Sequence, residues 1–152
     1  MVRISLVTLL LFFCLPNAQA QVGLVLPDNI TPGPVWRVSM FKVKPGKMPE
    51  VMKEWAQNLR PINEELKKQG LIVDYRLYIN STAESPGDWN YAVAVAYRNW
   101  AALDDLGQKA DAIALRHFGT REKRQEAIDR RNQIRELVST RLMREVTLNP
   151  LP

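Results

Sequence analysis

The sequence predicts an α+β fold in which helices cover one face of a four-stranded antiparallel sheet. Segments 35–43, 71–79, 90–98 and 139–148 contain the β-branched and aromatic residues that favour strands. A long amphipathic segment separates the first two strands, and a short turn-rich loop joins the second strand to the third. Two helical segments precede the fourth strand, so the predicted order is β-α-β-β-α-α-β.

The first strand and the helix after it follow from alternation, turn residues and helical spacing. Residues 35–43 (VWRVSMFKV) alternate in polarity, and a KPGK turn follows them. Pro49 suits the first turn of a helix, and Gly70 ends that helix after Gln69. Pro61 lies inside it and predicts a kink or a break. Apolar residues at helical spacing form one face, and they are Val51, Trp55, Leu59, Ile62 and Leu66.

The later elements are bounded by turn and capping residues. The loop NSTAESPGDW separates the two middle strands, of which 90–98 (NYAVAVAYR) alternates strictly. Asn99 can cap the next helix. Gly119 interrupts the chain, and Thr120 can cap a charged helix over 121–138, which is followed by the last strand. Antiparallel strands with helical crossovers on one face make the predicted arrangement ferredoxin-like.

The domain organisation begins with an apolar leader. Residues 1–20 place Arg3 before an apolar run and end in Ala-Gln-Ala, which is typical of a signal peptide cleaved before Gln21. An uncleaved anchor is the alternative. We expect an extended leader over 21–34, the folded domain over 35–148 and a tail over 149–152. The protein is therefore predicted to be exported, either periplasmic or secreted, without stable membrane insertion after cleavage.

Composition excludes several classes of site from the mature chain. The single cysteine, Cys14, lies in the predicted signal peptide, so no disulfide, zinc–cysteine cluster or cysteine nucleophile is expected. Without residues 1–20 the formal net charge falls from +5 to +4. Basic and acidic residues interleave along 121–138, which favours a solvated helix over a nucleic-acid-binding surface. We expect no nucleic-acid partner.

Two passages resemble the dimeric α/β-barrel superfamily, particularly its antibiotic-biosynthesis-monooxygenase-like and NIPSNAP-like members. They are the KVKPGK turn that leads into the helix with Trp55, and the strand-to-helix passage YAVAVAYRNWAALDDL. The resemblance covers 35–148. It implies a ferredoxin-like domain that forms a homodimer, with two sheets packed face to face around a cavity. Members range from haem-degrading and quinone-forming oxygenases to proteins without known activity, so enzymatic activity is left open.

The two faces of the predicted sheet differ in polarity. We expect the helices to cover an apolar face that includes Trp36, Val38 and Met40. The opposite face carries small alanines among charged residues, which predicts a partly polar cavity for a small apolar or anionic ligand. The candidate ligand-binding residues on that face are Arg37, Asp74, Arg76, Tyr78, Ala94 and Glu145. The alternative is a network of ion pairs that binds no ligand.

His117 is the single histidine, and it ends the predicted helix before Gly119. An imidazolium there is favoured by the negative end of the helix, so a capping or packing role is expected. Some haem-degrading relatives use a helical histidine as the axial ligand, which makes haem the alternative cofactor for His117. No metal site is expected, because neither a second histidine nor a cysteine can complete one.

Three functions follow as hypotheses. The first is an exported dimer that binds a small molecule without a cofactor. The second is an oxygenase-like enzyme, either haem-dependent through His117 or cofactor-free on an aromatic substrate. The third is a structural envelope protein that uses the sheet face only for dimerisation. No glycine-rich phosphate loop, G-x-S-x-G or HExxH sequence points to another reaction class, and the catalytic residues are unknown.

Overall fold

The computed structural model describes residues 27–82, 85, 87–104 and 106–151. The predicted signal peptide lies outside these residues. The main elements in chain order are β1 (Ile30–Val43), α1 (Met48–Glu54), α2 (Arg60–Lys68), β2 (Asp74–Ile79), β3 (Tyr91–Tyr97), α3 (Leu106–Phe118), α4 (Arg121–Ile134) and β4 (Arg135–Leu148).

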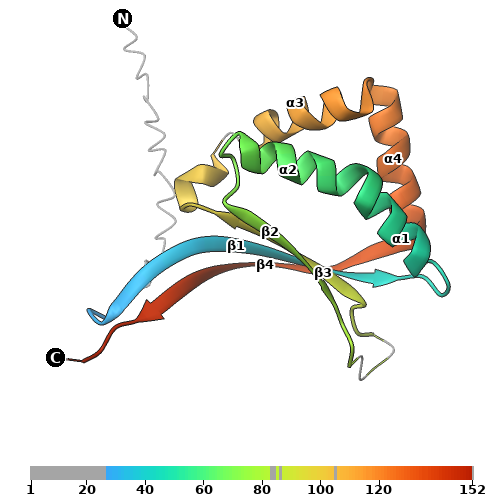
Figure 1. Ribbon diagram of the computed structural model, residues 1–152. Helices are drawn as coiled ribbons and strands as arrows, with labels where there is room; N and C mark the ends of the chain where they lie inside the picture. The colour runs from blue at the N-terminus through green and yellow to red at the C-terminus, as the bar shows by residue number, and fades with distance from the viewer. Residues whose placement is uncertain (1–26, 83–84, 86, 105, 152) are drawn as a thin grey trace, which may run out of the picture.

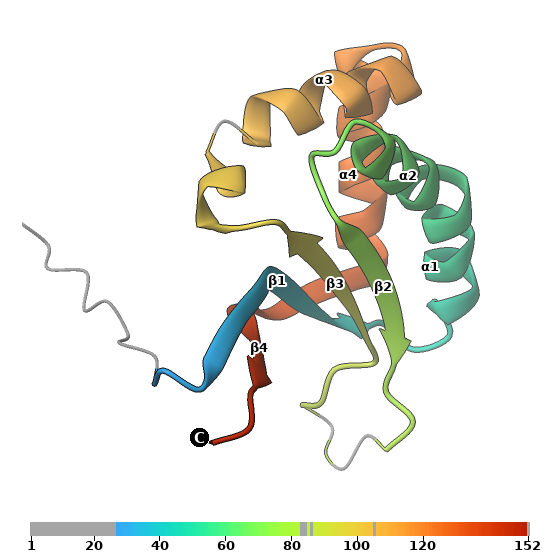
Figure 2. The same cartoon turned by 60° about the vertical axis from the view of Figure 1, so that its left-hand side comes forward.

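The strands form one four-stranded sheet in the order β2-β3-β1-β4. Each of its three neighbouring pairs is antiparallel. All four helices lie on one side of this sheet (Figure 1), and the view in Figure 2 shows α3 above α2 with α4 behind. The predicted α+β class and ferredoxin-like arrangement are therefore confirmed.

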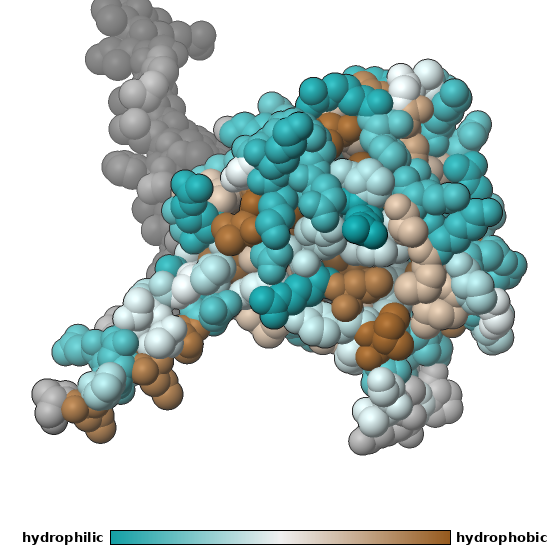
Figure 3. Space-filling view, viewed as in Figure 1, coloured by the Kyte–Doolittle hydropathy of each residue, from teal (hydrophilic) through white to brown (hydrophobic). Residues whose placement is uncertain are grey.

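β1 and β4 are longer than predicted. β1 begins at Ile30, so residues 30–34 of the predicted leader pair with the end of β4 across a bulge. Asn149, predicted to lie in a tail, donates its backbone N–H to Asn29 O at 2.7 Å. Together these segments form a two-stranded arm that projects from the helix-covered part of the sheet (Figure 1), and Figure 3 shows apolar side chains among the polar ones on it.

The first helical region stays continuous through Pro61 because one turn widens. Residues 55–59 form a π-helical turn between α1 and α2. The backbone N–H of Arg60 donates to Trp55 O, five residues earlier. A proline ring inside a helix clashes with the carbonyl four residues earlier, and a π turn displaces that carbonyl. The predicted disruption therefore takes the form of a widened turn.

Two predicted caps are confirmed. The Asn99 side chain accepts a hydrogen bond from Ala102 N at 3.0 Å and begins a short 3₁₀ helix, Trp100–Leu103, before α3. Thr120 Oγ1 accepts from Lys123 N at 3.2 Å at the start of α4. Gly119 between α3 and α4 has φ of 83°, a conformation that other residues rarely adopt. These residues place the sharp turn between the two helices.

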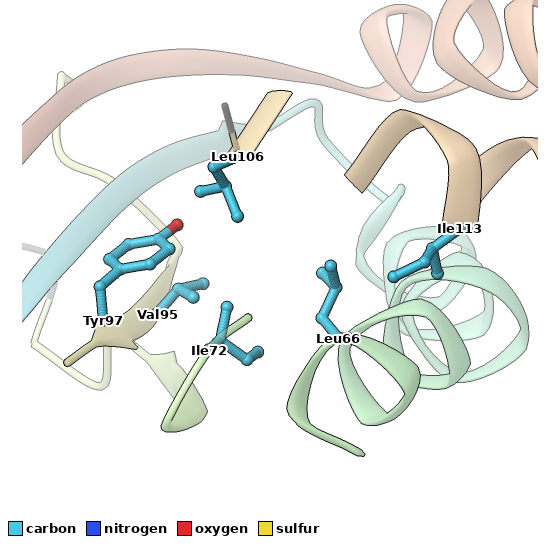
Figure 4. Packing of buried hydrophobic residues seen from close by; sticks show 6 residues of the cluster. All are labelled: Leu66, Ile72, Val95, Tyr97, Leu106 and Ile113. Carbon is cyan, nitrogen blue, oxygen red and sulfur yellow. The ribbon is translucent and has the colours of Figure 1, made fainter. Parts of the chain in front are cut away.

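The core lies between the helices and one face of the sheet. Its buried members come from four separate elements and loops (Figure 4): Leu66, Ile72, Val95, Tyr97, Leu106 and Ile113. Tyr91 and Tyr97 of β3 are both 0% exposed on this face. Tyr91 Oη accepts a hydrogen bond from the Arg135 guanidinium, whereas Tyr97 Oη has no partner among the described residues. Burial raises the pKa of both tyrosines.

No helix in the described part of the chain is both long and apolar enough to cross a membrane.

Candidate functional site

The sheet face opposite the helices, called the open face below, is covered by no other element of the described chain (Figure 1). Strand register aligns its side chains in rows across β2, β3, β1 and β4. The rows are Tyr78, Ala92, Met40 and Ser139; Arg76, Ala94, Val38 and Arg141; and Asp74, Ala96, Trp36 and Met143. Alanines therefore form a low central column on β3, with large side chains on both sides.

A groove of about 670 Å³ follows this column. Apolar residues dominate its lining: Trp36, Val38, Met40, Ile79, Trp89, Ala92, Ala94 and Met143. Its polar lining comes from Tyr78 and residues 80–82 at one end, and from Arg144 and Glu145 at the other. The volume falls within the range of small-molecule sites, in which a few polar groups stand out from an apolar lining.

Arg76 crosses the alanine column beside the groove. It starts on β2, and its guanidinium carbon lies 5.2 Å from the centre of the Trp36 ring on β1, with β3 between the two strands. Trp36 Nε1 in turn donates to Glu145 Oε2 at 2.7 Å. A cation over an indole ring is favourable, and the hydrogen bond fixes the orientation of the ring. Arg76, Trp36 and Glu145 therefore form a polar boundary at one end of the groove.

Asp74, at the start of β2, forms ion pairs with two basic side chains. Its Oδ1 accepts from Lys67 Nζ at 2.9 Å, and Arg76 Nε lies 3.4 Å from its Oδ2. The hydrogen bond from Lys67 is the main cause that lowers the pKa of the Asp74 carboxyl, which stays ionised at neutral pH. Hydrogen bonding to Tyr78 and then to Asp74 raises the pKa of Arg76. A permanent cation, Arg76, therefore lies just beyond one end of the groove.

The structure places every predicted ligand-binding residue except Arg37 on the open face. Tyr78, Ala94 and Glu145 line the groove, while Asp74 and Arg76 lie just beyond its end. These residues come from β2, β3 and β4, and the sheet brings them together as predicted. Whether they bind a ligand stays a prediction.

The predicted orientation of β1 was wrong. Trp36, Val38 and Met40 lie on the open face, and Arg37 lies on the helix-covered face, where its guanidinium carbon is 5.5 Å from the centre of the Tyr97 ring. The cause is strand pairing: Arg37 is directly opposite Val95, whose side chain belongs to the core. Directly paired residues project to the same face, so Arg37 follows Val95.

Most of the apolar lining of the groove was therefore not predicted from the sequence. Trp36, Val38 and Met40 were assigned to the core, and Trp89 joins the lining from the loop before β3. The alternate residues Tyr91, Val93, Val95 and Tyr97 are the larger set on β3 and mark its helix-covered side. They do not fix the orientation of β1, which depends on the register between the two strands.

His117 lies in the helix layer and not among the residues that line the groove. Its Nε2 is 3.0 Å from Asn58 Oδ1, in the π-helical turn. Asn58 Nδ2 donates to Glu54 Oε2 at 2.6 Å, so Oδ1 is the acceptor and Nε2 carries the proton. The hydrogen bond to Asn58 agrees with a packing role for His117, and haem as the alternative cofactor stays a prediction.

Among the described residues, no group of three or more His, Cys, Asp or Glu side chains could hold a metal ion.

Comparisons with known proteins give little similarity. The sequence significantly matches no protein-family model and no curated protein. One similar solved structure is the crystal structure of HapK from Hahella chejuensis, with a TM-score of 0.47 and 12% identity. The alignment covers 73% of this chain and 91% of HapK. The fold assignment above rests on the strand order and register of this chain.

Proposed function

We propose that the protein is an exported small-molecule-binding protein whose binding site is the groove on the open face. The observation that carries the proposal is an apolar groove of about 670 Å³ over buried alanines. If the alanines of β3 served only to pack the sheet of a monomer, large side chains on both sides of the alanine column would not be required. A ligand with a flat apolar body fits the column between Tyr78 and Met40.

The ligand class follows from the charges at one end of the groove. Arg76 places a guanidinium group just beyond this end, over the Trp36 ring, while the Glu145 carboxylate is already hydrogen-bonded to Trp36. Guanidinium groups bind carboxylate, sulfonate and phosphate oxygens through paired N–H donors. The proposed ligand therefore has an apolar body and one anionic group.

A second copy of the chain is proposed to close the groove. Tyr78 and Met143, on opposite sides of the groove, are 45% and 47% exposed, so large apolar side chains of the open face have no cover within the described chain. Two open faces packed together would bury these side chains and convert each groove into part of an internal cavity. This is the face-to-face homodimer that the sequence resemblance implies.

The proposal is tested with two related dyes. 1-Anilinonaphthalene-8-sulfonate has an apolar body with an anionic group, and N-phenyl-1-naphthylamine has the same body without the charge. We expect the sulfonate dye to bind the mature protein with an increase in fluorescence. Ala94→Phe fills the alanine column and should weaken both dyes at least about tenfold. Ala112→Phe, on an exposed position of α3, is the matched control and should bind like the wild type.

A further variant separates the charge from the apolar contacts. Arg76→Gln should weaken the sulfonate dye and leave the uncharged dye unchanged. Sedimentation velocity on each variant shows whether the dimer persists, so loss of the cavity and loss of the dimer are distinguished. Equal binding of the sulfonate dye by Ala94→Phe and wild type would overturn the groove as the site.

A further inference from the structure

A second groove lies at one end of the sheet, and we call it the sheet-end groove. It has a volume of about 500 Å³. Its walls include Pro32 and Pro34 of β1, Ile72 and Val73 before β2, Arg98 after β3 and Arg144 of β4. Antiparallel pairing brings these segments together at one end of the sheet: Val35 of β1 is opposite Tyr97 at the end of β3, and Asp74 at the start of β2 is opposite Ala96. The start of β2 and the end of β3 lie side by side in Figure 2.

The floor and walls of this groove are held firmly. Val73 N donates to Ala96 O at 2.7 Å, which ties the segment before β2 to β3. Ile72 is buried in the core cluster. Gly33, between the two prolines, lets β4 approach closely: a Cβ at this position would lie 3.2 Å from both Cβ and O of Glu145. The groove is therefore formed by packed backbone and not by loose loops.

Charge in the sheet-end groove is of one sign. Arg98 and Arg144 line it, and no Asp or Glu does. Neither guanidinium has a hydrogen bond, ion pair or ring contact among the described residues. The carboxylates on adjacent segments are engaged elsewhere, because Asp74 pairs with Lys67 and Arg76, and Glu145 accepts from Trp36. Two cations in one groove repel each other, and a bound anion would remove that repulsion.

We propose that the sheet-end groove binds an organic anion, whose carboxylate or phosphate lies between Arg98 and Arg144 and whose apolar part rests on the Pro32, Pro34 and Val73 side chains. Two guanidinium groups from different strands can each supply paired donors to one oxyanion. Val73 is 44% exposed, and contact with an apolar ligand would cover it. This site is distinct from the alanine-floored groove on the open face, although Arg144 reaches both.

Octanoate is the probe, and acetate and 1-octanol are the comparison ligands that carry only the carboxylate or only the chain. Binding is followed by the ¹H–¹⁵N signals of the arginine Nε–H groups in the full mature protein. Octanoate should shift the Arg98 and Arg144 signals in a saturable way, and acetate or 1-octanol should bind at least about tenfold more weakly. Equal binding of acetate would overturn the apolar contribution, and equal binding of 1-octanol would overturn the role of charge.

Arg98 is the decisive position, because it lines the sheet-end groove and not the groove on the open face. Arg98→Gln should weaken octanoate at least about tenfold. Octanoate also fits the ligand class proposed for the open-face groove, so the Arg98 signal is the readout for this site. Ala94→Phe should leave the octanoate titration of that signal unchanged, and failure of this site and failure of the proposed function are therefore separable. Arg121→Gln, on the exposed surface of α4, is the matched control for loss of one positive charge. Unchanged octanoate binding by Arg98→Gln would overturn the proposal.

Discussion

Two buried tyrosines of β3 provide a matched test of the core. Tyr91 and Tyr97 are both 0% exposed and both face the helices. Their hydroxyls differ, because Tyr91 accepts from Arg135 and Tyr97 has no partner within the described residues. Replacement by phenylalanine keeps each ring, including the stacking of Tyr91 on Phe41 at 5.1 Å between centres. The pair of variants therefore isolates the two hydroxyl groups.

The expected changes in unfolding free energy have opposite signs. A buried hydroxyl without a partner costs about 1–3 kcal/mol, so Tyr97→Phe should stabilise the protein by about 1 kcal/mol. A hydrogen bond to a charged group contributes about 1.5–3 kcal/mol, so Tyr91→Phe should destabilise it by about 1.5 kcal/mol. For a domain of this size these values correspond to a Tm about 4 °C higher and about 6 °C lower.

Urea unfolding monitored by tryptophan fluorescence measures both changes. The three proteins are compared at one protein concentration, since dimerisation makes apparent stability depend on concentration. The slope of unfolding free energy against urea should stay constant while the midpoint moves. A destabilised Tyr97→Phe would show that its hydroxyl has a partner, and a neutral Tyr91→Phe would refute the contribution of Arg135.

Three further predictions use the same urea assay. Ile113→Ala should cost about 3 kcal/mol, because Ile113 is 3% exposed in the core cluster, and a loss below about 1 kcal/mol would contradict its packing. Thr120→Ala should cost about 1 kcal/mol by removing the cap of α4, and an unchanged midpoint would mean that the cap contributes nothing. Asp74→Asn should lower stability at pH 7. The folded-state pKa of Asp74 lies below its ordinary 3.8, so its contribution is present above that value and is lost as the pH falls through the folded-state pKa. A difference between wild type and Asp74→Asn that did not shrink as the pH was lowered below 3.8 would exclude this origin.

Local signals in the sequence were sufficient for the element order and for the caps. Asn99 and Thr120 act as predicted because a cap depends on residues within one turn. The boundary between α4 and β4 was misplaced, since residues 135–138 suit either structure by local preference. Strand pairing decides it: Arg135 is opposite Val43, and its guanidinium carbon lies 4.2 Å from the centre of the Phe41 ring. Such a contact between distant segments has no local signature.

The candidate site was predictable on β2, β3 and β4 but not on β1. On β3 one set of alternate residues is large and the other is alanine, so the two faces are distinct. On β1 one set of alternate residues, Trp36, Val38 and Met40, is apolar, and the other mixes Phe41 with polar residues such as Arg37. The apolar set was assigned to the core, whereas in the structure it lines an exposed groove. In the sequence of a single strand, an apolar face that lines a binding groove has the same alternation of apolar residues as a face that packs into the core.

Native mass spectrometry of the mature protein, purified from the exported fraction of its own host, tests the central proposal most directly. It reads the oligomer mass and any retained small molecule in one spectrum. We expect a dimer that carries a discrete additional mass, and Ala94→Phe should lose this mass. A monomer without an adduct would contradict both the closed groove and its use as a binding site.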